Sequence, residues 1–183
     1  MYTSRYRQKT SQPTRDRIVA AVRDLLAEGA FHVSTVEEVA VRAGVSRATL
    51  YQHFGSRLGL VDAMCEAFDA NPALVALRAT ESVEEFVARV VDFWATEEKV
   101  LAELYGAAAV DPAAAALVER QRNDRNHELR RLLRSIGTPD RGAFAALTVL
   151  TSFETYRELR RNAGLSRRDV TATLQDSARR LLA

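Results

Sequence analysis

Apolar residues recur at helical spacing along most of the chain, and each run starts or stops at a residue typical of a helix terminus. In residues 14–28 four apolar side chains share one helical face: Ile18, Val22, Leu25 and Leu26. Similar stripes predict helices over 82–111, 112–136, 138–162 and 166–182, with a connection at 73–81. The spacing therefore predicts an all-α fold.

Two short helices are predicted in residues 35–57, joined by a tight turn. Ser34 or Thr35 can cap the first helix, and Glu37 and Glu38 follow where the positive helix end favours acids. Gly44 ends that helix, because a positive φ costs glycine nothing. Ser46 caps the second. The apolar positions that face inward are Val36, Val39, Ala40, Ala43, Val45, Leu50 and Phe54. This pattern indicates a helix-turn-helix.

The same stretch carries a more specific motif. The segment AVRAGVSRATLYQHFGSR, preceded by an amphipathic helix ending in EGAFHVSTVEEVA, closely resembles the DNA-binding domain of the TetR family of transcriptional regulators. The resemblance covers roughly residues 14–65, and the rest of the chain matches only in length, helical character and position. It implies a homodimer that binds a palindromic operator and is usually released by a ligand in its C-terminal domain.

The second helix of the motif is predicted to enter the major groove of DNA. Arg47 has the fork geometry to bind O6 and N7 of a guanine, and a phosphate contact is the open alternative. Thr49 can touch a thymine methyl or a phosphate, and Ala48 permits close approach. The full set of predicted DNA-contact residues is Thr35, Ser46, Arg47, Ala48, Thr49, Tyr51, His53 and Arg57.

The family resemblance supplies the roles of the remaining members of that set. It implies phosphate contacts from Tyr51 and His53, although an exposed His53 without a role is the alternative. Thr35 matches a position that commonly holds the DNA backbone through its hydroxyl or amide. Arg57 stands where the family usually has lysine, and it keeps the charge.

One position departs from the family pattern. Gly59 lies at the start of the next predicted helix, which continues to about Asp69. A glycine there weakens a helix by about 1 kcal/mol relative to alanine. In the family this helix usually transmits the ligand signal, so a softer start is expected to alter coupling.

Charge is distributed unevenly around a net value of +2. Residues 1–60 hold nine Lys and Arg against five Asp and Glu, whereas the remainder holds 17 against 19. A positive N-terminal third fits a module that binds an anionic polymer. We divide the chain into a flexible basic arm (1–13), a helix-turn-helix domain (14–58) and a helical regulatory and dimerisation domain (59–183). A solvated tail without a role is the alternative for the arm.

A ligand pocket in the C-terminal domain is implied by the resemblance. Its candidate lining residues are Phe93, Trp94, Tyr105, His127, Phe153 and Tyr156, with ordinary core packing as the alternative for each. The last two helices resemble the dimer-forming pair of the family, and packing within one subunit is the alternative. Arginines between 120 and 134 alternate with acids at helical spacing, which favours a salt-bridged solvated face over a second nucleic-acid surface.

Other classes of protein find little support in the sequence. The longest charge-free run, residues 142–153, is 12 residues long and too short to cross a bilayer, and the N-terminus lacks the apolar stretch of a secretion signal. A cytoplasmic location is therefore expected. One cysteine and three scattered histidines predict neither an internal disulfide nor a metal site, and no catalytic motif or cofactor loop occurs.

These observations predict a non-enzymatic, homodimeric repressor without cofactors, which binds a palindromic DNA operator and is released by a small molecule. A transcriptional activator or a ligand-independent regulator is the alternative within DNA binding. A helical small-molecule-binding protein or enzyme with a vestigial helix-turn-helix is the alternative from another class.

Overall fold

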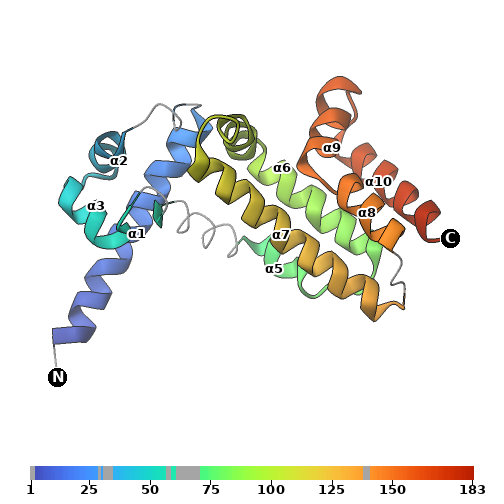
Figure 1. Ribbon diagram of the computed structural model, residues 1–183, viewed down its shortest axis with the longest axis horizontal. Helices are drawn as coiled ribbons and strands as arrows, with labels where there is room; N and C mark the ends of the chain where they lie inside the picture. The colour runs from blue at the N-terminus through green and yellow to red at the C-terminus, as the bar shows by residue number, and fades with distance from the viewer. Residues whose placement is uncertain (1–2, 29, 31–34, 57–58, 61–70, 138–140) are drawn as a thin grey trace. The chain divides into compact units, whose positions relative to one another are not determined.

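The computed structural model describes residues 3–28, 30, 35–56, 59–60, 71–137 and 141–183 (Figure 1). All regular secondary structure in these residues is helical, which confirms the predicted fold class. They fall into two compact units, one from residues 1–68 and 99–119 and the other from 69–98 and 120–183. No helix in the described part of the chain is long and apolar enough to cross a membrane.

The first helix is longer than the sequence pattern predicts. α1 spans Thr3–Ala27 and has Pro13 in its interior, so residues 3–13 of the segment that we predicted to be a flexible arm lie in this helix. The segment contains no glycine, and six of the twelve residues before Pro13 have good helix propensity. The predicted apolar stripe is confirmed, because Ile18, Val22 and Leu26 are fully buried.

Two short helices pack against α1 and complete a three-helix unit. α2 spans Val36–Ala43 and α3 spans Arg47–Phe54, and both contact α1 as well as each other (Figure 1). Val39, Ala40 and Leu50 are buried from these two helices, as predicted. From their apolar side chains we also expect Phe31 and Val33 to close this core, but both lie outside the described residues, as does most of the helix expected after Arg57.

The second unit is built from parts of two long helices and from the C-terminal helices. In chain order the elements are α5 Pro72–Leu77, α6 Val83–Ala107, α7 Pro112–Ser135, α8 Arg141–Leu150, α9 Phe153–Arg157, a π-helical turn Glu158–Asn162 and α10 Arg167–Leu182. α5 lies in the stretch that the sequence predicted to be a connection, and the Asn71 side chain caps it. α8 and α10 pack against each other (Figure 1).

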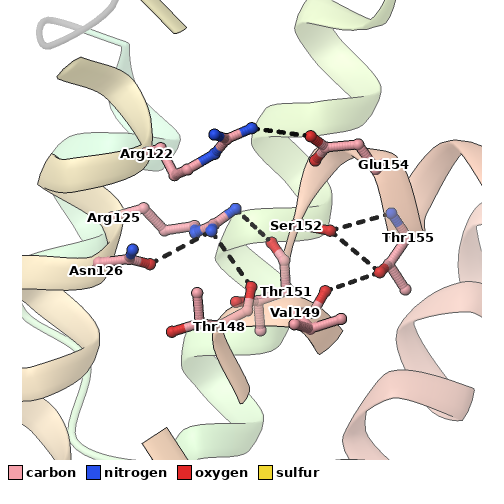
Figure 2. Close-up of polar contacts among 9 residues, drawn as sticks. All are labelled: Arg122, Arg125, Asn126, Thr148, Val149, Thr151, Ser152, Glu154 and Thr155. Carbon is pink, nitrogen blue, oxygen red and sulfur yellow. Dashed lines mark hydrogen bonds and ion pairs between the residues drawn. The ribbon is translucent and has the colours of Figure 1, made fainter. Parts of the chain in front are cut away.

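The helix predicted over residues 138–162 is interrupted at Thr151 and Ser152. Ser152 is extended, with φ −74° and ψ 157°, and its hydroxyl accepts a hydrogen bond from Thr155 N at 3.1 Å, which starts α9 as a new helix. The break leaves carbonyl groups of the last turn of α8 without partners in that helix. Trp94 Nε1 donates to the Thr151 carbonyl at 3.2 Å. Arg125 Nη1 donates to the same carbonyl at 3.1 Å, and Arg125 Nη2 donates to the Thr148 carbonyl at 3.3 Å (Figure 2).

The arginines of α7 lie in two kinds of environment, the surface and the interior. Arg122 pairs with Glu154 at 3.0 Å and Arg131 with Glu128 at 2.8 Å, as expected for a salt-bridged face. Arg125 differs, because only 4% of its surface is exposed and its guanidinium lies 5.9 Å from the centre of the Trp94 ring. Arg125 therefore packs in the interior of the unit and does not belong to its charged surface.

Candidate nucleic-acid interface

The first helix of the motif is held by reciprocal hydrogen bonds at its N-terminus. Glu38 N donates to Thr35 Oγ1 at 3.2 Å, and Thr35 N donates to the Glu38 carboxylate at 2.6 Å. This is a capping box, which satisfies two backbone donors at once. Both groups through which Thr35 was predicted to hold DNA are thus engaged within the chain, although its hydroxyl proton remains able to donate.

The turn between the two helices depends on Gly44. Its φ of 63° lies in the left-handed region, and the amides of Gly44 and Val45 donate to the carbonyls of Val41 and Ala40 at 3.1 and 3.0 Å. These bonds close the end of α2. Because the left-handed Gly44 turns the chain sharply, only three residues separate the end of α2 from the start of α3.

The second helix is capped by Ser46 and oriented by its apolar side. Ser46 Oγ accepts a hydrogen bond from Thr49 N at 3.0 Å and lies 2.8 Å from Thr49 Oγ1. Leu50 is fully buried and Phe54 is 9% exposed. Because these two side chains face the core, the other side of α3 faces solvent.

Six of the eight predicted DNA-contact residues lie on α3 or at its cap. Ser46, Arg47, Ala48 and Tyr51 are exposed, and Thr49 and His53 are half-buried. Thr35 is exposed at the start of α2, and Arg57 lies outside the described residues. The centroid of the His53 ring lies 6.1 Å from that of the Phe54 ring. The exposed side of α3 presents one cation, hydroxyl groups and a small residue, which suits a helix that enters a groove.

Arg47 has the side chains of Tyr51 and Glu37 as neighbours on this surface. Its guanidinium lies 5.5 Å from the centre of the Tyr51 ring, and its Nη1 is 3.9 Å from the Glu37 carboxylate. The Tyr51 side chain raises the pKa of Arg47 above its usual value, and the charge of Glu37 adds a smaller contribution. An arginine guanidinium is charged at physiological pH in any case. We did not single out Glu37 as a site residue from the sequence, where it stood only as an acid in the first turn of a helix.

The predicted ligand residues divide into three groups. Phe93, Trp94, Phe153 and Tyr156 are buried together, with successive ring centroids 5.1, 5.4 and 6.1 Å apart. His127 is exposed on α7, and Tyr105 is half-buried in the part of α6 that belongs to the other unit. Direct ring-to-ring contact favours the core-packing alternative for the four clustered aromatics. Their part in ligand binding stays a prediction.

The polar ends of the aromatic cluster are satisfied. Trp94 donates to the Thr151 carbonyl, and the Tyr156 hydroxyl donates to Glu98 at 3.1 Å. Burial raises the pKa of Tyr156 above its usual value, and the charge of Glu98 adds to the effect. Elsewhere an open depression of about 560 Å³ lies on α10, lined by Arg167, Arg168, Thr171, Ala172 and Gln175. It includes none of the predicted ligand residues, and the described residues contain no cluster of metal-ligating side chains.

Comparison with known proteins separates the N-terminal part of the chain from the rest. Residues 18–64 match the model of bacterial regulatory proteins of the tetR family. The chain is 37% identical over 57 residues to the HTH-type transcriptional regulator UidR of Escherichia coli K12, and 42% identical over 55 residues to the HTH-type transcriptional regulator AlkX of Mycobacterium tuberculosis. These matches cover 31% and 30% of the chain, but only 29% of UidR and 26% of AlkX.

Structural similarity extends over nearly the whole chain. A crystal structure of a transcriptional regulator from Rhodococcus sp. Rha1 matches with a TM-score of 0.67, covering 92% of this chain and 95% of that one. Sequence identity is 22%, so this likeness concerns the fold. Similarity in sequence is thus concentrated in the helix-turn-helix, whereas the helical arrangement that follows it is shared at the level of structure.

Proposed function

Since residues 18–64 match the model of the tetR family, we propose that this protein is a homodimeric transcriptional repressor released by a small-molecule effector. It binds a palindromic DNA operator through α3, acts without a cofactor and works in the cytoplasm. The observation that carries the proposal is the exposed side of α3, where Arg47 stands beside Tyr51 on a helix whose opposite side is buried.

Each protomer is expected to read one half of the operator. A two-fold dimer places two copies of α3 in successive major grooves, so half-site centres should lie roughly 34–36 Å apart or at a multiple of that distance. Lys and Arg contacts to phosphates supply most of the affinity, and contacts of Arg47 and Thr49 to base edges supply the sequence preference. The C-terminal helices α8 and α10 are the proposed dimer-forming pair. Val149 on α8 and Leu181 on α10 are exposed in the single chain and are available for that contact.

The proposal is tested by selecting bound sequences from a random duplex pool with the full-length protein at physiological salt. We expect a palindrome whose half-sites obey the spacing given above. Recovery of no preferred sequence, with or without candidate effectors, would refute sequence-specific recognition. The position of the recovered palindrome relative to promoters distinguishes repression from the alternative, activation.

The role of Arg47 is tested by replacing it with alanine. If its fork binds a guanine edge, the change should cost about 1–3 kcal/mol of binding free energy and relax the preference at one position of each half-site. The affinities of single-base variants of the selected duplex measure this effect. The control is Arg42→Ala, which removes the same charge from α2, where Arg42 pairs with Glu28 at 2.6 Å. A uniform loss across all sequences would mean that Arg47 holds only phosphate.

Release by an effector follows from a shift between two conformers of the dimer. A compound that binds more tightly to the conformer with misplaced α3 helices moves the protein off DNA. We place the effector near the buried aromatic cluster, whose apolar surface favours a hydrophobic or aromatic molecule.

Trp94 reports directly on this placement, because it is the single tryptophan of the chain. We expect compounds that release DNA to change its fluorescence, since ligand entry would alter its contacts with Phe93 and Phe153. The measurement is an emission titration run in parallel with a DNA-release assay. Releasing compounds that all leave the emission unchanged would remove the cluster from the effector site.

A further inference from the structure

Glu37 is a charged residue beside the exposed side of α3, close to Arg47. Neither helix cap requires it. Its neighbour Glu38 completes the capping box with Thr35, so Glu37 is not needed to start α2. Its carboxylate lies 3.9 Å from the Arg47 guanidinium, and the two side chains are 63% and 62% exposed. A carboxylate that faces DNA is unfavourable in itself, because it repels phosphates.

We propose that Glu37 is a specificity-determining residue. It restrains the Arg47 side chain and disfavours binding of Arg47 to DNA phosphates more than binding of Arg47 to a guanine edge. The inference rests on the proposed function and names a second residue of the same surface. Glu37 acts through Arg47, so it is a positioning residue rather than a base-reading one.

The two kinds of acceptor differ in charge, and this difference produces the selectivity. O6 and N7 of guanine are neutral acceptors, so Arg47 can bind them while its lateral contact with Glu37 is kept. A phosphate is an anion, and Arg47 cannot bind it without bringing that negative charge close to Glu37. Binding to random DNA depends almost entirely on phosphates, so Glu37 weakens it more than it weakens binding to the selected site.

Tyr51 provides a second contact to the same guanidinium. The centre of its ring lies 5.5 Å from the Arg47 guanidinium carbon. Arg47 therefore contacts both an acid of α2 and an aromatic ring of α3 before DNA is bound. A held arginine loses less side-chain freedom when it binds a base edge.

The test compares full-length variants on two probes, a duplex of scrambled sequence and the duplex recovered by selection. Glu37→Gln should bind the scrambled duplex about two- to fivefold more tightly, the range expected for an exposed ion pair. The affinity of Glu37→Gln for the selected duplex should rise less. The ratio of affinity for the selected duplex to affinity for the scrambled duplex should therefore be lower than in the unchanged protein. Fluorescence anisotropy at fixed salt gives both values.

Two further variants separate this mechanism from a general effect of charge. Glu28→Gln removes the same charge and also frees an arginine, Arg42, but not one on α3. Arg47→Met removes the group through which Glu37 acts. We expect little change for Glu28→Gln, and we expect the gain from Glu37→Gln to be clearly smaller in the Arg47→Met background, where only direct repulsion between Glu37 and phosphates is left to relieve.

The inference is overturned if Glu28→Gln tightens binding to the scrambled duplex as much as Glu37→Gln does. It is equally overturned if the gain is as large without Arg47 as with it, or if Glu37→Gln leaves the scrambled duplex unaffected. The measurements on the scrambled duplex do not need a known operator. Failure of the sequence selection would therefore count against the proposed function, whereas a gain that is absent or independent of Arg47 would count against Glu37.

Discussion

Replacing Arg125 with alanine is expected to lower the free energy of unfolding by about 2–4 kcal/mol. Arg125 donates to the carbonyls of Thr148 and Thr151, at the break between α8 and α9 where the helix itself offers no donors. The alanine variant leaves the Thr148 carbonyl without this donor and also removes the packing of the guanidinium against Trp94. Trp94 still donates to Thr151, so the loss should be partial.

Arg122 is the matched control for this change. It lies on the same helix and is also paired, but its partner Glu154 is more than half exposed and the pair lies at the surface (Figure 2). Arg122→Ala should therefore cost less than about 1 kcal/mol. Urea unfolding followed by far-ultraviolet circular dichroism measures both variants. Equal losses would show that Arg125 does not hold the helix break.

The second large effect is expected at Gly59, where replacement by alanine should destabilise the helix-turn-helix by about 1–3 kcal/mol. A Cβ atom built on Gly59 would overlap the Phe54 carbonyl oxygen and lie 2.9 Å from its carbonyl carbon. Both atoms belong to the backbone at the end of α3, so they cannot move aside as a flexible side chain would. Phe54 anchors α3 in the core, and its displacement should also weaken binding to the selected duplex.

Gly106→Ala provides the control for Gly59. Gly106 lies within α6, and no atom beyond its near neighbours lies within 4 Å of a Cβ placed there. This change should raise the free energy of unfolding by about 0.5–1 kcal/mol, because alanine favours the helix. Thermal unfolding of both variants tests the pair. A stabilised Gly59→Ala variant would support the sequence-based expectation that glycine merely softens the helix start.

Gly59 also illustrates a limit of reading helix propensity from sequence. The sequence predicted that glycine weakens the following helix relative to alanine. The structure reverses the preference at this position, since the Phe54 carbonyl occupies the space that a side chain would need. A propensity scale describes an isolated helix and contains no information on a close approach by a preceding one.

The candidate recognition surface was predicted largely from sequence, because its determinants are local. Thr35 and Ser46 cap helices a few residues away, Gly44 is left-handed, and Leu50 and Phe54 face the core. Each of these features depends on residues within one or two turns. The pattern therefore identified α3 and the side of it that faces solvent.

Features that depend on distant residues were decided only by the tertiary structure. The break at Thr151 requires donors from Trp94 and Arg125, which lie 57 and 26 residues away, and the local sequence at 138–162 reads as one continuous helix. The pairing of Glu37 with Arg47 likewise depends on how α2 crosses α3. By itself, the sequence determined the helical character, the helix-turn-helix and its caps, since these arise from neighbouring residues. The tertiary structure decided which carbonyls are satisfied by distant donors, why Gly59 must stay a glycine and which acid lies beside Arg47. These features depend on contacts that form only when separate helices come together.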